Sequence, residues 1–116
     1  KGVVTVEDTA KVSQTGREVD GDPAGTSMIA LSGAQHIGVF VDYTIYSDGK
    51  ANMRSGTIQM VFDEIGNVQF TDNSTLDIGD TTPATFTADP TAVPLVRLLF
   101  NAPDPTWHVR YHVRYL

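Results

Sequence analysis

Two histidines four residues apart, His108 and His112, lie in the closing segment WHVRYHVRYL of this 116-residue chain. On a helix, side chains four apart are neighbours, and two imidazoles at that spacing can bind zinc. The segment is rich in Trp, Tyr and Val, which favour strands, and it follows two prolines. On a strand, residues four apart are separated by about 13 Å, too far to share one ion. We therefore predict a strand here and expect no metal at this pair.

The strand interpretation divides the segment into two faces, because successive side chains of a strand point to opposite sides. One face is expected to pack in the core, and the other face has two interpretations. It is either a solvent face whose arginines pair with acids on adjacent strands, or a surface that binds a ligand or another protomer. The expected core face carries Trp107, Val109, Tyr111, Val113 and Tyr115. The candidate residues of the other face are His108, Arg110, His112 and Arg114, followed by Leu116.

Tyr46 and Lys50 are two further candidates, on either side of the dipeptide Asp48-Gly49. That dipeptide predicts a hairpin loop, because Gly tolerates the positive φ that such a turn demands. A tyrosine at a loop edge can stack on a pyranose ring and donate a hydrogen bond to it. Of the other aromatic residues that could bind sugar, we expect most to lie in the core.

Acidic residues are a second possible source of chemistry, at Asp20-Gly21-Asp22 and at Asp72, Asp77 and Asp80. Neither group matches the calcium loop with its central Gly and terminal Glu, and acidic loops are usually solvated. Carboxylates can meet across strands as in glycosidases, but nothing marks one with a raised pKa. No nucleophile elbow or glycine-rich phosphate loop is present in the sequence. We therefore predict no enzyme and no cofactor.

Composition excludes several classes of partner. Eight Lys and Arg against fourteen Asp and Glu give a net charge of −6, which disfavours nucleic acid and anionic membrane. The sequence has no Cys, so disulfides and thiolate chemistry are excluded, and it has no apolar run long enough for membrane insertion. Because it begins at Lys1 without an initiator Met or a leader, we expect an excised module or a cleavage product.

Strand signals recur at short spacing and no stretch keeps a helical period, which predicts an all-β domain. The clearest strand is 36–46, where apolar side chains alternate from Ile37 to Ile45. About eight short strands in a chain of this length favour an antiparallel β-sandwich of jelly-roll type, with a small β-barrel as the alternative. The other strands are predicted at 28–33, 55–63, 68–72, 84–89, 94–101 and 107–116.

The chain divides at Met28 into an N-terminal arm and a β-sandwich domain, 28–116. The arm, 1–27, is polar, with possible short strands at 2–8 and 10–15 and a Gly- and Pro-containing loop at 16–27. It is expected to be a linker from a preceding domain or a strand exchanged between protomers.

The strings of 28–116 resemble the small β-sandwich modules at or near the C-terminus of tailed-bacteriophage tail fibres and tailspikes. The resemblance rests on Arg-Ser-Gly-Thr-Ile at 54–58, Thr-Asp-Asn at 71–73, Ala-Thr-Phe-Thr-Ala at 84–88, Val-Arg-Leu-Leu at 96–99 and the final aromatic strand. It implies an extracellular appendage of the virion, usually a homotrimer, that helps a fibre fold or binds the host's surface polysaccharide. Enzymatic tailspikes generally carry their active centre in a separate β-helix, and no functional residue is carried over.

Three functions follow from this resemblance and the residues. The first is a structural and attachment module of a tail fibre or tailspike, which trimerises and binds host cell-surface glycan. The alternative is a capsid or tail decoration protein without a ligand. A polysaccharide-degrading enzyme is a third, which the absence of catalytic motifs disfavours.

Overall fold

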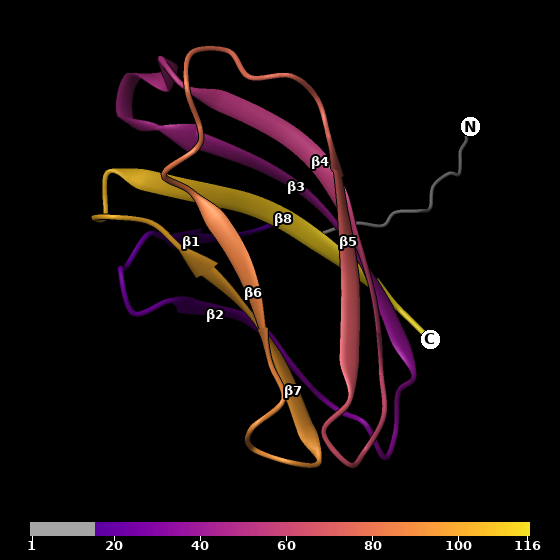
Figure 1. Cartoon of the computed structure of the whole chain (residues 1–116). Helices are drawn as coiled ribbons and strands as arrows, with labels where there is room; N and C mark the ends of the chain where they lie inside the picture. Colours follow the sequence, from indigo (N-terminus) through magenta and orange to yellow (C-terminus); the bar gives the residue numbers. More distant parts are fainter. Residues whose placement is uncertain (1–15) are drawn as a thin grey trace, which may run out of the picture.

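The computed structural model describes residues 16–116, which form eight strands (Figure 1). The expected strands at 2–8 and 10–15 lie outside these residues. A single 3-10 turn, η1 (Asp48–Lys50), lies between the third and fourth strands. The strands are β1 (Arg17–Asp20), β2 (Thr26–Ser32), β3 (Gly38–Ser47), β4 (Met53–Phe62), β5 (Val68–Ser74), β6 (Thr85–Asp89), β7 (Leu95–Asn101) and β8 (Trp107–Tyr115).

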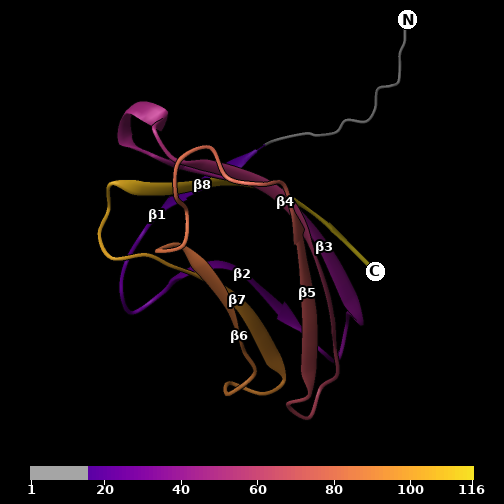
Figure 2. The ribbon, with the colours of Figure 1, turned by 45° about the horizontal axis from the view of Figure 1, so that its top comes forward.

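The strands form two antiparallel sheets, which confirms the predicted β-sandwich. The large sheet has the order β1-β8-β3-β4-β5 and the small sheet the order β2-β7-β6. β1 pairs with β8 and β2 pairs with β7, so strands from the start of the described chain lie beside strands from its end, as in a jelly roll. Figure 2 shows the large sheet lying over the small one and curving down beside it. Among residues 16–116 the sheets do not close into one barrel, so the barrel alternative is wrong.

Alternation of side chains along the strands builds the core between the sheets. On β3 every second residue from Val39 to Ile45 is buried, and on β4 the same is true from Ile58 to Phe62. β7 contributes alternate buried residues from the small sheet. The largest fully buried side chains are Phe100, Ile45, Ile58 and Leu98. This core fixes which face of each strand of the large sheet remains outside, here called the outer face.

The hairpin that joins β3 to β4 has the predicted turn chemistry. Gly49 has φ 73° and Lys50 has φ 60°, in the left-handed region. A second glycine, Gly56 on β4, is required by a close approach, because a Cβ there would lie 2.7 Å from the hydroxyl oxygen of Tyr43. The turn joins β3 to β4 in the register that places Tyr43 directly opposite Gly56.

Three details differ from the sequence prediction. The predicted loop 16–27 contains β1, which pairs with β8, and its last two residues begin β2. Ile37, expected on the inner face, is exposed because β3 begins only at Gly38. Tyr115 is also exposed, since it lies at the end of β8, beyond the residues His108 to Tyr111 that pair with β1, whereas Trp107 and Tyr111 are buried as predicted.

Candidate functional site

The row of His and Arg on β8 lies on the outer face of the large sheet, between β1 and β3. Opposite Arg110 the register places Glu18 of β1 and Thr44 of β3. The four side chains His108, Arg110, His112 and Arg114 are here called the outer row. Tyr46 lies on the same face opposite His108, whereas Lys50 is exposed in η1.

His108 contacts a carboxylate with each ring nitrogen. Its Nδ1 lies 2.7 Å from Oδ1 of Asp20 on β1, and its Nε2 lies 2.6 Å from Oδ1 of Asp48 in η1. The contact with Asp48 and then the contact with Asp20 raise the pKa of His108, because both carboxylates favour the imidazolium. This one side chain therefore links three elements of the fold.

Arg110 donates two hydrogen bonds to Glu18, from Nε at 3.1 Å and from Nη2 at 3.0 Å. The hydroxyl of Tyr46 donates to the same carboxylate oxygen at 2.8 Å. The bond from Tyr46 is the main cause that lowers the pKa of Glu18, and Arg110 adds to it. Tyr46 is thus already engaged, with the Arg110 guanidinium 5.8 Å from its ring centre.

At the other end of the outer row, Asp42 of β3 lies between three side chains. Arg114 approaches it to 3.6 Å and His112 to 3.9 Å. The hydroxyl of Thr57 donates to it at 2.9 Å. The guanidinium of Arg114 also lies 5.0 Å from the ring centre of Phe40, within cation–π range. Each arginine of the outer row is therefore paired with an acid of the same chain, as the solvent-face interpretation requires.

A shallow depression of about 780 Å³ crosses the outer face from β8 to β5. Its polar lining comes from four strands and offers hydroxyl, amide, imidazole and carboxylate groups. Within residues 16–116, the Thr44 and Ser55 hydroxyls bond only each other, at 2.6 Å, so both keep capacity for a further hydrogen bond. The polar side chains that line it include Asp42, Thr44, Ser55, Thr57, Asn73, Arg110 and His112.

A second hollow of about 450 Å³ lies on the same face near the C-terminus, and apolar residues make up a larger share of the residues that line it. Ile37, Phe40, Val61 and Leu116 line it. Among these, Ile37 is 67% exposed, Val61 60% and Leu116 68%. One face of the large sheet therefore carries a polar region and an apolar region side by side.

Glu18, Asp20 and His108 bring possible metal-ligand atoms within 4.8 Å of one another. However, both nitrogens of His108 contact carboxylates, and Glu18 accepts from Arg110 and Tyr46. These contacts already engage all three side chains of the group, so we assign no ion to it. Of the acids weighed for calcium, Asp80 accepts from the backbone of Thr82 and Asp72 accepts from Tyr43.

A polar cluster on the inner side of the large sheet was not predicted. Tyr43 donates to Asp72 at 2.6 Å, and Arg54 donates to the buried hydroxyl of Thr81 at 3.0 Å. Thr81 in turn donates to Asp77 at 2.7 Å. Burial, and then the bond to Asp72, raise the pKa of Tyr43 to about 12. We call these five residues the inner cluster.

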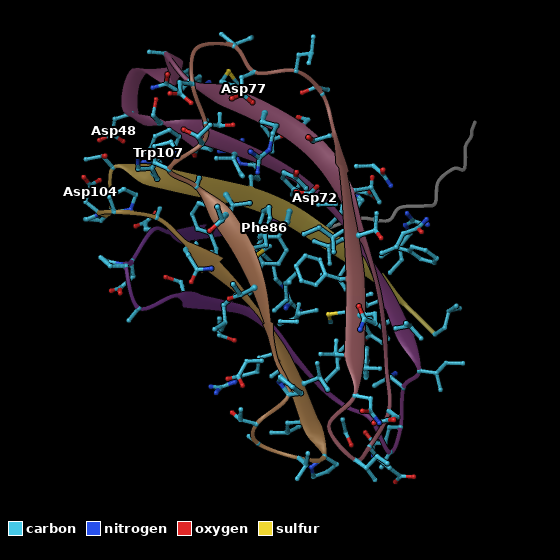
Figure 3. The ribbon with its side chains drawn as sticks, in the orientation of Figure 1. Asp48, Asp72, Asp77, Phe86, Asp104 and Trp107 are labelled. Atoms are coloured by element: carbon cyan, nitrogen blue, oxygen red, sulfur yellow. The ribbon has the colours of Figure 1, made fainter. Side chains whose placement is uncertain are left out.

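The inner cluster ties the long connection between β5 and β6 to the large sheet. Figure 3 shows Asp72 beside β5, Asp77 above it in the connection between β5 and β6, and Phe86 below them. The Tyr43 ring packs edge-to-face on Phe86 at 4.7 Å. Because Tyr43 is packed there and its hydroxyl is held by Asp72, the cluster is a structural support rather than an open site.

Sequence signals for the inner cluster were weak. Arg54 lies just before the predicted strand 55–63, and Thr81 lies in a segment without periodicity. The only usable signal was the spacing of Asp77 and Thr81, four residues apart, which suits a local side-chain to backbone bond such as the one observed at 2.7 Å. The partners on other strands follow only from the register.

No family model matches the chain, and no curated protein matches its sequence. The described part of the chain contains no helix long and apolar enough to cross a membrane.

Proposed function

We propose that this domain is a non-enzymatic attachment module that binds a glycan in the polar depression of the outer face. The observation that carries the proposal is the lining of that depression, which presents hydroxyl, amide and charged groups from four strands. Flat arrays of such groups suit the many hydroxyls of a sugar, and the rigid sheet holds them in place. The resemblance to tail-fibre and tailspike modules suggests host surface polysaccharide as the ligand and the virion tail as the location.

A homotrimer is the second part of the proposal. Its support is the exposed apolar hollow at Ile37, Val61 and Leu116, because contiguous apolar surface marks sites of protein association. Sedimentation of the full chain tests it. We expect a trimer that Val61→Lys weakens, and a strictly monomeric wild-type protein at high concentration contradicts it.

Binding of the full chain to an array of bacterial surface glycans tests the main proposal. Asn73→Ala removes an amide from the depression and should weaken binding about tenfold, the effect of one lost hydrogen bond. Thr71→Ala is the matched control, because Thr71 lies two residues away on β5 and lines the apolar hollow instead. Equal binding by both variants, or no binding by the oligomeric wild-type protein, overturns the proposal.

The alternative function is a capsid or tail decoration protein without a ligand. One observation favours it: the arginines of the outer row are paired with acids of the same chain. A glycan would then have to compete with these pairs. Loss of particle assembly on deletion of the domain, together with no glycan binding, supports this alternative.

A further inference from the structure

His108 is held from two sides by carboxylates of different elements. Asp20 on β1 lies 2.7 Å from Nδ1, and Asp48 in η1 lies 2.6 Å from Nε2. An ionised carboxylate oxygen can only accept a hydrogen bond, so each of these contacts needs an N–H on the ring. Both contacts together require the doubly protonated imidazolium.

The other charged groups around this ring largely satisfy one another. Glu18 on β1 pairs with Arg110 on β8 at 3.0 Å. Tyr46 of β3, whose ring centre lies 5.0 Å from that of His108, donates its hydroxyl to Glu18. Lys50 is the remaining charged side chain of η1 besides Asp48. His108 is therefore the cation that contacts both Asp20 and Asp48, and its single charge offsets one of their two negative charges.

β1 is the element that depends most on this contact. It is four residues long and, within the described part of the chain, lies at the edge of the large sheet, paired on one side only, with β8. Val19 is only partly buried and is the one hydrophobic residue of β1 that packs on the core. Because so little apolar surface holds β1, the side-chain contacts of Asp20 and Glu18 count for a large share of its attachment.

We propose that His108 is a proton-operated clamp that ties β1 and η1 to β8 while doubly protonated, and loosens β1 when it loses one proton. A neutral imidazole has one N–H, so it can donate to Asp20 or to Asp48 but not to both. The carboxylate left over then faces a nitrogen lone pair, and the two repel each other. The clamp does not depend on glycan binding.

The direction of the pH effect follows from the raised pKa of His108. Its ordinary value is 6.5, and the two carboxylates raise it in the folded protein. The stabilisation is therefore complete below about pH 6.5 and is lost as the pH rises through the raised value. Attachment of β1 weakens toward alkaline pH.

Hydrogen exchange of the β1 backbone amides in the full chain, between about pH 6 and pH 9 and corrected for intrinsic exchange, tests the clamp. Protection of Arg17–Asp20 should fall about tenfold for each unit by which the pKa of His108 exceeds its ordinary value. Amides of β3 and β4 should keep their protection. His108→Gln should abolish the pH dependence at β1.

His112→Gln is the matched control, because His112 lies on the same strand and face. Its contact with an acid is longer than those of His108, at 3.9 Å from Asp42. It should keep the pH dependence of β1. The imidazole of His108 can also be titrated by NMR, and its midpoint should fall in Asp20→Asn and in Asp48→Asn. An identical pH dependence of β1 in wild type and His108→Gln, or a His108 midpoint at or below 6.5, overturns the proposal.

Discussion

The inner cluster and the outer row occupy opposite sides of the large sheet, and both contain arginine–acid contacts. On the inner side, Arg54 is 15% exposed and bonds the buried Thr81. On the outer face, Arg110 is 68% exposed. Water screens the contact of Arg110 and can replace it, whereas the buried hydroxyl of Thr81 has no such access to water. Similar residue types therefore contribute differently to stability, according to the side of the sheet on which the register places them.

Substitutions on the apolar side of β8 should cause the largest loss in the free energy of unfolding. Trp107→Ala and Tyr111→Ala each remove a buried ring and should lower the free energy of unfolding by about 3 to 5 kcal/mol. Tyr111 also donates to the backbone oxygen of Met28 at 2.6 Å, which its loss leaves unpaired. Urea denaturation measures both variants. A loss no larger than that of an outer-row variant contradicts the assignment of the two faces.

Arg54→Ala should have the next largest effect. It removes the donor to Thr81 and the cation that lies 3.9 Å from Asp72. We expect a loss of about 2 kcal/mol in the free energy of unfolding, because polar groups on the inner side lose their partner. Thermal unfolding and urea unfolding should give the same loss in the free energy of unfolding. A loss below about 0.5 kcal/mol would show that water replaces the arginine and that the inner cluster is wet.

Arg110→Ala and Arg114→Ala are the matched variants on the outer face. Each should lower the free energy of unfolding by less than about 1 kcal/mol, because exposed pairs contribute little. The small loss should shrink further in about 1 M salt, where such pairs are screened. Glycan binding and sedimentation of the same proteins then report on function. Losses that match Arg54→Ala would remove the distinction between the two sides.

The smallest expected effect is the titration of Glu18. Tyr46 and Arg110 lower its pKa below 4.5, so its contribution is complete above that pH and is lost as the pH falls through the lowered value. In Tyr46→Phe, NMR should show the Glu18 midpoint rising toward 4.5, since the strongest cause is removed. An unchanged midpoint would assign the shift to Arg110 instead.

Alternation predicted the inner side of the large sheet well. Val39 to Ile45 on β3 and Trp107 to Tyr111 on β8 follow period two, and both segments bury the expected side chains. β1 was missed because Arg17, Glu18 and Asp20 surround a single Val, and an edge strand needs little apolar surface. Pairing with β8, which no local pattern encodes, makes it a strand.

The candidate residues were predictable as a row but not by their partners. Glu18 is 92 residues from Arg110, and Asp20 is 88 residues from His108. Such contacts follow from the register of β1 on β8, which a single sequence does not reveal. The function of the outer row stays a prediction, as do Tyr46 and Lys50 as ligand residues.

The pairing of β1 with β8 also has a mechanical consequence. Arg17 at the start of β1 lies opposite Tyr111, and in Figure 1 the chain enters β1 and leaves β8 toward the same side. A pulling force applied between residue 16 and Leu116 would open this ladder from one end, like a zipper. Each pair of backbone hydrogen bonds would then carry the whole force in turn instead of sharing it. The domain should yield at low force when it is stretched between its two ends, and β1 should detach first.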